Sequence, residues 1–247
     1  MIMTSILRSV WHSTTHGNHL NMLKPLVKDS YTQRVTSHMT KSQTELSGLY
    51  VITDDKLSGT SVLEHVQQAL KGGARLVQYR NKTNQAAIKE MTARSLLELG
   101  REYGVPLLIK DDVELAVTIG ADGVHLGQSD VKLSEARRQL GTKAIIGVTC
   151  HASLELAKQA EKNGASYVAF GRFFASQTKP DASSASIDLL TTAKQQLSIP
   201  ICAIGGITLD NAPTLVDAGA DMLAVIHGVF GQENIKDAAN HYAKLCI

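Results

Sequence analysis

From residue 48 onward, short apolar runs alternate with longer stretches in which apolar residues recur every three or four positions. Apolar runs of about five residues that end at polar residues or glycine are typical of buried β-strands. Eight runs of this kind predict strands at Leu49–Thr53, Arg75–Tyr79, Pro106–Ile109, Gly123–Leu126, Ala144–Val148, Tyr167–Phe170, Ile201–Ile204 and Met222–Ile226.

The stretches between these runs have the period of amphipathic helices, and glycine follows many of them, as helix C-termini prefer. They predict helices at Val62–Leu70, Ala86–Tyr103, Val113–Ile119, Leu133–Leu140, Leu154–Asn163, Ile187–Gln196, Ala212–Ala218 and Ile235–Leu245. Strands that alternate with helices form a parallel sheet, and eight such units in about 200 residues predict a single (β/α)8 barrel, the TIM barrel.

A doubly wound open sheet is the alternative fold. It would place phosphate-binding glycines directly after the first strand, in the pattern G-x-G-x-x-G. Here Leu49–Thr53 is followed by Asp54 and Asp55, and the pattern is absent. The barrel is therefore the better interpretation.

Residues 1–46 lack this regular pattern and are rich in Ser, Thr, His and Asn. We expect them to be a disordered or non-native N-terminal extension, and residues 47–247 to form the catalytic barrel domain. An organelle-targeting segment and a working start at Met39 are both left open.

Composition narrows the range of partners. The net charge of +2 argues against nucleic acid or an anionic membrane as the main partner, and no apolar run is long enough to span a bilayer. The three cysteines, Cys150, Cys202 and Cys246, have no paired spacing, so we expect reduced thiols in a soluble, cytoplasmic protein. Homo-oligomer formation is left open.

The barrel interpretation directs attention to the C-terminal ends of the strands, where barrel enzymes carry their active sites. After the second strand, Gln78, Arg80 and Lys82 alternate along the chain and should share one face, while Tyr79 and Asn81 take the other. An amide with two cations suits a phosphate or diphosphate. A solvated charged loop explains the same residues equally well.

Two acidic residues leave neighbouring strands at the same edge. Asp111 follows the third strand and Asp130 follows the fourth. Magnesium commonly binds one or two carboxylates and completes its shell with water and phosphate oxygens, so this pair could hold one Mg2+ ion. Asp111 or Asp112 could instead cap the next helix; we assign the cap to Asp112 and the metal to Asp111, although the spacing nearly allows the reverse.

Phosphate-binding groups recur at the later strands. Ser176, Thr178 and Lys179 lie in a long loop after the sixth strand, and the seventh ends in Gly205-Gly206, whose backbone N–H groups are open to a ligand. The eighth ends in Ile226-His227-Gly228, at a usual phosphate position of barrels. Two separate phosphate-holding regions suggest a transferase with two small phosphorylated substrates.

Thr149 at the fifth strand is a hydrogen-bond donor. Its neighbours Cys150 and His151 are a poor nucleophile and base, since adjacent residues diverge where a strand ends.

The motifs QYRNK, IKDDVELA, GADGVHLGQSD, IIGVTCH, ASYVAFGRFFASQTK, PICAIGGIT and LAVIHGVFG, in this order, resemble those of the thiamine phosphate synthase family. The resemblance covers the chain from Gly48 to its C-terminus. It implies a magnesium-dependent transferase that joins a hydroxymethylpyrimidine diphosphate to a thiazole phosphate, or its carboxylated precursor, and releases pyrophosphate. The implied mechanism is dissociative: the diphosphate leaves, and the thiazole nitrogen captures a pyrimidine-stabilised cation.

The resemblance also implies roles for single residues. Arg80, Lys82 and Lys179 are the expected catalytic residues, and Asp111 and Asp130 the expected ligands of one Mg2+. The pyrimidine diphosphate is expected to bind Gln78, Tyr79, Arg80, Asn81, Lys82, Lys110, Thr149 and Lys179. The thiazole phosphate is expected to bind Ser176, Gln177, Thr178, Gly206, Ile226 and His227.

Three positions depart from the family pattern, which often has Asn at Lys110, Pro at Arg172 and Ser at His227. Two other functions compete with the synthase. A thiazole tautomerase paralogue would share the barrel and the thiazole phosphate site but would not need Arg80 or Asp111. A non-catalytic barrel that senses phosphate ligands would bind the same molecules without turnover.

Overall fold

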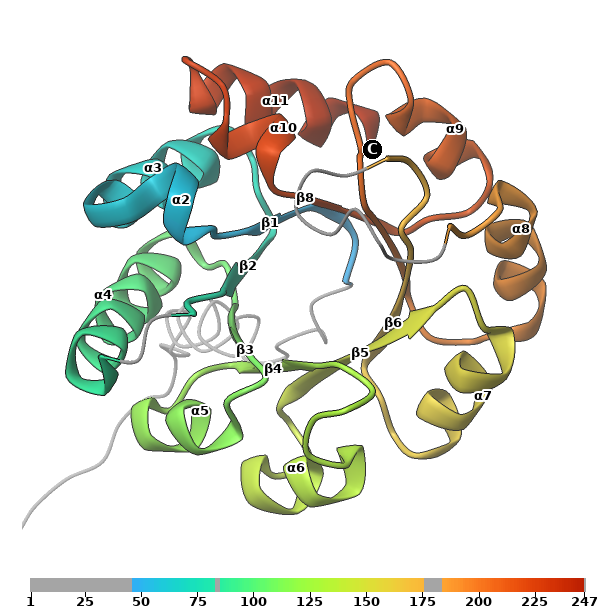
Figure 1. Ribbon diagram of the computed structural model, residues 1–247, viewed down its shortest axis with the longest axis horizontal. Coiled ribbons are helices and arrows are strands. Elements are labelled where there is room, and N and C mark those ends of the chain that lie inside the picture. Colours follow the sequence, from blue (N-terminus) through green and yellow to red (C-terminus); the bar gives the residue numbers. More distant parts are fainter. Residues whose placement is uncertain (1–45, 83–84, 176–183, 247) are drawn as a thin grey trace, which may run out of the picture. The chain divides into compact units, whose positions relative to one another are not determined.

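The computed structural model describes residues 46–82, 85–175 and 184–246, and these fold into a closed barrel of eight parallel strands in sequence order (Figure 1). Every strand pairs with its neighbours along the chain, and β1 pairs with β8 to close the sheet. The strands are β1 (Gly48–Ile52), β2 (Leu76–Tyr79), β3 (Leu107–Lys110), β4 (Gly123–Leu126), β5 (Ile145–His151), β6 (Tyr167–Phe170), β7 (Ile201–Ile204) and β8 (Met222–Val225).

Helices form a ring around the barrel (Figure 1). The longer ones connect successive strands or close the chain: α3 (Val62–Lys71), α4 (Ala86–Tyr103), α5 (Val113–Ile119), α6 (Leu133–Leu140), α7 (Leu154–Lys162), α8 (Ile187–Gln196), α9 (Ala212–Asp217) and α11 (Ile235–Leu245). Three short pieces lie at strand exits or beside α3: α2 (Asp55–Ser58), the 3-10 turn η1 (Gly59–Ser61) and α10 (His227–Phe230).

The predicted barrel is confirmed, and the strands and long helices lie where the apolar period placed them. The largest difference is β5, which continues to His151 through an irregular register between Thr149 and His151. The short pieces α2, η1 and α10 were missed, because one helical turn is too short to show a period.

Buried apolar residues form two layers, one outside and one inside the sheet. The outer layer lies between strands and helices and includes Val51, Val77, Ile109 and Leu223. The inner layer fills the barrel with alternate strand residues: Tyr50, Ile52, Leu76, Leu108, Tyr167, Ala169, Cys202, Met222 and Ala224. Because strand side chains alternate, polar residues next in this inner series must also point into the barrel.

One inner layer is shaped by a missing side chain. His125 of β4 pairs with Gly147 of β5, and Gly147 pairs with Tyr167 of β6. A Cβ atom added to Gly147 would collide with the ring and hydroxyl of Tyr167. The glycine therefore gives Tyr167 the space to lean across β5 towards His125.

The expectation for residues 1–46 falls almost entirely outside the described residues. Leu46, the first described residue, is buried and packs with the inner layer. Among the described residues no helix is long and apolar enough to cross a membrane. The three cysteines are free thiols, as predicted.

Candidate functional site

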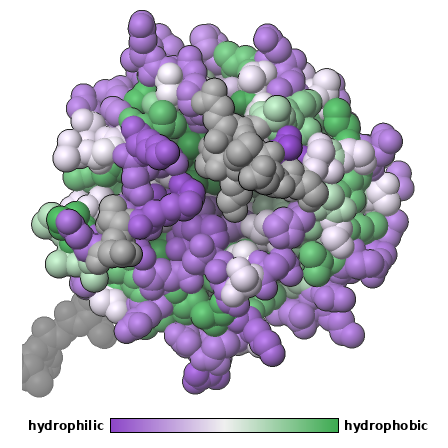
Figure 2. Space-filling view, viewed as in Figure 1, coloured by the Kyte–Doolittle hydropathy of each residue, from purple (hydrophilic) through white to green (hydrophobic). Residues whose placement is uncertain are grey.

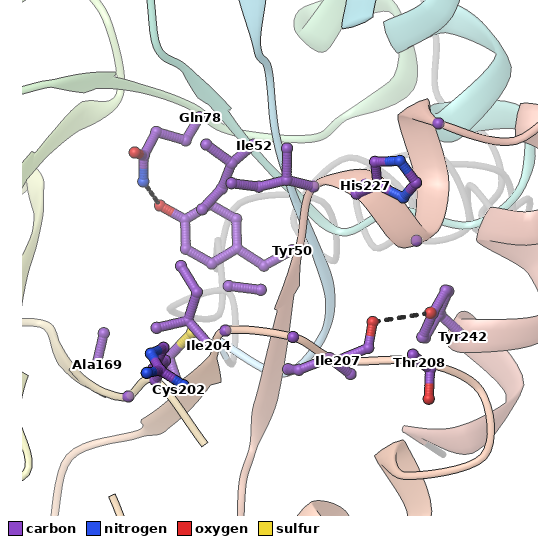
Figure 3. Close-up of a pocket in the computed structure, with 18 of the residues that line it drawn as sticks. Tyr50, Ile52, Gln78, Ala169, Cys202, Ile204, Ile207, Thr208, His227 and Tyr242 are labelled. Atoms are coloured by element: carbon purple, nitrogen blue, oxygen red, sulfur yellow. Dashed lines mark hydrogen bonds between the residues drawn. The ribbon is translucent and has the colours of Figure 1, made fainter. Parts of the chain in front are cut away.

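A cavity of about 1060 Å³ opens at the C-terminal ends of the strands. Figure 2 shows hydrophilic residues around the mouth of the barrel, in the same view as Figure 1. The lining includes residues from the inner layer, such as Tyr50 and Ala169, and from the loops after β7 and β8 (Figure 3). The volume suffices for two small ligands at once.

The first wall carries Arg80, which follows β2 and is largely buried. Its guanidinium Nη1 donates to Asp54 Oδ2 at 2.9 Å, and its backbone N–H donates to Thr53 Oγ1. Asp55, the next residue, accepts from the backbone N–H of Lys82 at 2.8 Å. The exit of β1 therefore holds the exit of β2 in place and fixes the direction of the arginine.

These fixing residues, Thr53, Asp54 and Asp55, were missed as parts of the site. Their signal was present in the sequence, since two acids directly after the first strand must lie beside the cations that follow the second. Parallel neighbours in a barrel leave the sheet at the same edge.

The second wall carries Lys110, and the two acids predicted to converge, Asp111 and Asp130, do converge on its side chain. The ammonium of Lys110, at the end of β3, contacts Asp111 Oδ1 and lies 3.4 Å from Asp130 Oδ2. Asp130 Oδ2 also accepts from the backbone N–H of Gly127 at 2.6 Å. The backbone of Asp111 turns back at the end of β3 with φ of 64°, a conformation that residues other than glycine rarely adopt.

Asp112 caps α5, as predicted. Its Oδ1 accepts from the N–H of Leu115 at 2.9 Å, and its Oδ2 accepts from Lys89 Nζ at 2.6 Å. Burial works to raise the pKa of Asp112, but the hydrogen bonds from Lys89 and Leu115 hold it below the ordinary value. Asp111 is therefore left to face the second acid.

The donor set of this wall fits a hard divalent cation. Asp111 Oδ1 is buried, and a second carboxylate, that of Asp130, shares its cationic neighbour Lys110. No cluster of three or more His, Cys, Asp or Glu ligands occurs in the described part of the chain. Magnesium does not require one, because one or two carboxylates with water and phosphate oxygens satisfy its octahedron.

A chain of buried polar side chains crosses the barrel floor. The amide Nε2 of Gln78 donates to the hydroxyl of Tyr50, and the hydroxyls of Tyr50 and Tyr167 are 2.9 Å apart. Tyr167 then meets His125 Nδ1 at 2.7 Å, and His125 Nε2 meets Thr149 Oγ1 at 2.8 Å. Five strands contribute one residue each, and Figure 3 shows the contact of Gln78 with Tyr50.

The donor and acceptor capacities of these five side chains decide which group donates in each hydrogen bond. An amide nitrogen can only donate, so the Tyr50 hydroxyl accepts a hydrogen bond from Gln78 and donates one to Tyr167. Tyr167 then donates to His125 Nδ1, which leaves the imidazole proton on Nε2, donating to Thr149. Burial raises the pKa of both phenols, so both stay protonated. The proton of Thr149 is free to donate into the cavity.

The third wall is built of backbone at β7 and β8. Gly205 and Gly206 have φ of 105° and 67°, and a Cβ on Gly206 would collide with the carbonyls of Phe174 and Ala175. The short helix α10 begins at His227, directly after Ile226. Figure 3 shows His227 beside the cavity, on the side formed by the last strands.

The structure brings most of the described site predictions to one cavity, whose lining includes Gln78, Arg80, Lys110, Thr149, Gly206, Ile226 and His227. It does not bring Tyr79 there, because this residue belongs to the outer layer between strands and helices. Lys82 and Asn81 follow Arg80 but are not in the cavity lining. The predicted metal ligands Asp111 and Asp130 are not in it either, although both meet the lining residue Lys110. The predicted residues Ser176, Gln177, Thr178 and Lys179 lie outside the described residues.

Cys150 is not a nucleophile in this structure. Its side chain is fully buried, and burial raises the pKa of its thiol to about 12. The next residue, His151, is exposed at the end of β5 with φ of 49°. The sequence analysis rated these two residues a poor nucleophile and base, and the burial of Cys150 agrees with that expectation.

The chain is a (β/α)8 barrel with a cavity at the C-terminal ends of its strands, where barrel enzymes carry their active sites. Residues 49–229 match the family model described as thiamine monophosphate synthase. The chain belongs to this family, and it is a transferase of thiamine biosynthesis.

Solved structures agree with this assignment. The chain is 36% identical to a thiamine phosphate pyrophosphorylase from Pyrococcus furiosus, covering 80% of this chain and 94% of that one, with a TM-score of 0.74. The (S)-3-O-geranylgeranylglyceryl phosphate synthase from Thermoplasma acidophilum, solved with sn-glycerol-1-phosphate, is 14% identical. It has a TM-score of 0.61, covers 82% of this chain and 94% of its own, and shows the fold alone.

Proposed function

We propose that this enzyme joins 4-amino-2-methyl-5-(diphosphooxymethyl)pyrimidine to 4-methyl-5-(2-phosphoethyl)thiazole, giving thiamine monophosphate and pyrophosphate. With the carboxylated precursor of the thiazole, carbon dioxide is released as well. The observation that carries the proposal is one cavity with two unlike sides. The first and second walls form a cationic side with Arg80 and Lys110, where Lys110 also contacts the Asp111–Asp130 pair, and the third wall offers the backbone of Gly206 and α10. We expect the reaction to take place in the cytoplasm.

The diphosphate belongs at the cationic wall. Arg80 is already oriented by Asp54, so little side-chain freedom is lost when it binds a phosphate oxygen. Lys82 and Lys179 complete the cationic set by resemblance to the family. Asp111 and Asp130 would hold one Mg2+, which supplies further neutralisation of the diphosphate charge.

The pyrimidine ring fits the buried chain on the barrel floor. The two ends of this series of side chains offer different groups to a ligand: the carbonyl Oε1 of Gln78 accepts a hydrogen bond, and the hydroxyl of Thr149 donates one. An aminopyrimidine carries an amino donor and ring-nitrogen acceptors, so both ends find a partner. Residues Tyr50, Tyr167 and His125 act through Thr149 and Gln78, and we regard them as positioning residues.

The thiazole phosphate belongs at the wall of Gly206, Ile226 and His227. Backbone N–H groups at a glycine turn and after the eighth strand are the usual phosphate site of barrels. The resemblance adds Ser176, Gln177 and Thr178 to this group. Exposed at the start of α10, His227 can contribute its backbone N–H with or without its ring.

Bond breaking then needs no protein nucleophile. As the C–O bond to the diphosphate breaks, negative charge grows on the leaving oxygens, and Arg80 in the cavity can stabilise that charge. The resemblance to the family gives Lys82 and Lys179 the same role. The electron-rich aminopyrimidine stabilises the cation left behind, and the thiazole nitrogen donates its electron pair to form the new C–N bond. Positioning and charge stabilisation supply the rate.

The test is to incubate the protein with both substrates and Mg2+ and to measure pyrophosphate. We expect release that needs both substrates and Mg2+, and a fall of about a hundredfold or more in Asp111→Ala, since one preorganised charge is worth that much in a transition state. Binding without release would favour the sensor, and thiazole isomerisation without release the tautomerase.

A further inference from the structure

Lys110 occupies an unusual place for a residue that is expected to bind diphosphate. Its ammonium touches Asp111 and is 3.4 Å from Asp130, so it lies between the two carboxylates that we assign to the metal. The two acids are positioned independently of it. Asp130 is held by the N–H of Gly127, and Asp111 by the left-handed turn of the backbone at the end of β3.

We propose that Lys110 is the resident counter-ion of this carboxylate pair and that its charge suppresses divalent-cation binding to the substrate-free enzyme. A metal ion and an ammonium compete for the same oxygens, and bringing them together costs electrostatic repulsion. Lysine is well suited to leave, because it is a point charge on a flexible stem.

Lys110 also lines the cavity, so the same stem can reach a ligand there. When a diphosphate binds, its oxygens offer the ammonium a second anionic partner, and the pair is released for the metal. Metal and diphosphate therefore enter together. This inference rests on the proposed function of Asp111 and Asp130.

Equilibrium dialysis with Mn2+ tests the proposal directly, without turnover. The proteins are wild type, Lys110→Met, which keeps the stem and removes the charge, and Lys110→Arg, which keeps the charge. We expect substrate-free Lys110→Met to bind Mn2+ at least about tenfold more tightly than wild type, the change expected when one positive charge beside the ion is removed. Lys110→Arg should stay as weak as wild type.

A second arm adds pyrophosphate at equal concentration on both sides of the membrane. We expect wild type then to gain Mn2+ in the protein compartment, while Lys110→Met gains proportionally less. The double variant Lys110→Met/Asp111→Asn should lose the tight binding, which locates the ion at the carboxylate pair.

Each failure has a separate meaning. Equal Mn2+ affinity of wild type and Lys110→Met, lost on Asp111→Asn, would overturn the role of Lys110 and leave the metal site intact. Absence of Mn2+ binding in every protein, with pyrophosphate present, would overturn this inference together with the proposed metal site. Circular dichroism of each variant confirms that it is folded.

Discussion

The direction in which the Thr149 hydroxyl donates is decided at Tyr167, a residue in the middle of the barrel. Without the Tyr167 proton, His125 Nδ1 loses its donor and the imidazole is no longer held with its proton on Nε2. We therefore expect Tyr167→Phe to lower kcat/KM for the pyrimidine diphosphate about tenfold, with unchanged KM for the thiazole phosphate. Loss of one buried hydrogen bond should also lower the free energy of unfolding by about 1–2 kcal/mol.

The measurement is steady-state kinetics with each substrate varied in turn, beside urea unfolding. Ser166→Ala is the matched control, because the hydroxyl of this neighbouring residue also makes a partly buried hydrogen bond, accepting from the N–H of Ile146 at 3.0 Å, but it has no part in the hydrogen-bonded series from Gln78 to Thr149. It should lose similar stability and keep both kinetic constants. A Tyr167→Phe protein with lower stability and unchanged kinetics would show that the hydrogen-bonded side chains from Gln78 to Thr149 serve only packing.

Individual site residues could be predicted from the sequence when their charge had no structural explanation. Arg80 and Asp111 directly follow β2 and β3, and Asp130 lies in the loop after β4. Arg80 lines the cavity, and the two acids meet at Lys110, which also lines it. Tyr50, His125 and Tyr167 were missed, because inside a strand they resemble ordinary core residues. Their role depends on the register between strands, which the order of residues along one chain does not contain.

At the scale of elements, the sequence predicted long features and missed short ones. Strands such as Gly123–Leu126 and helices such as Ala86–Tyr103 were predicted to the residue, because apolar period and terminal glycines agree on where they begin and end. The four-residue helix α10 contains too few positions for a period. The extension of β5 to His151 depends on pairing with Phe170 of β6.

Strand β5 carries a steric requirement at Gly147. Its Cβ position is occupied by the ring of Tyr167, so Gly147→Ala must displace that ring and open the contact with His125. We expect a loss of about 1–3 kcal/mol in the free energy of unfolding, typical of overpacking, together with a higher KM for the pyrimidine diphosphate.

Gly104→Ala separates this effect from simple backbone strain. Gly104 ends α4 with φ of 67°, and nothing lies within 4 Å of an added Cβ. This variant should lose about 1 kcal/mol through strain and keep normal kinetics. Denaturant unfolding and kinetics of both variants decide the matter; normal KM values in Gly147→Ala would contradict the prediction.

The loop after β7 makes the complementary prediction for the other substrate. A Cβ on Gly206 collides with the carbonyls of Phe174 and Ala175, and alanine is strained at φ of 67°. Because the change moves the proposed phosphate wall, we expect Gly206→Ala to raise KM for the thiazole phosphate about tenfold or more. KM for the pyrimidine diphosphate should change little, so a shift confined to the pyrimidine substrate would contradict the assignment of the two walls.

The whole barrel is what makes a site from residues far apart in sequence. Arg80 follows β2, Lys110 ends β3 and His227 follows β8, yet all three line one cavity. Closure of the sheet between β1 and β8 places them around a common mouth. Eight parallel strands can be predicted from alternation alone, so the general location of the site follows from the fold.

Folding of the whole barrel also buries two cysteine thiols, and their burial makes the stability of the fold depend on pH. Burial raises the pKa of the Cys150 thiol to about 12, and burial raises the pKa of the Cys202 thiol as well. In the unfolded chain these thiols titrate near their ordinary pKa of about 8.5. Between that pH and the folded pKa, the unfolded state has fewer bound protons than the folded state, so stability falls as pH rises.

We expect these thiols to leave the free energy of unfolding of wild type unchanged below pH of about 8. By pH 10, ionisation of Cys150 in the unfolded state should lower that free energy by about 1–2 kcal/mol. Urea unfolding at pH 7.5, 9 and 10 measures this, with Cys150→Ala for comparison. The variant starts less stable, because a buried sulfur is lost, but its stability should decline less steeply with pH. Parallel pH profiles for the two proteins would show that the Cys150 thiol stays protonated, or ionises, equally in both states.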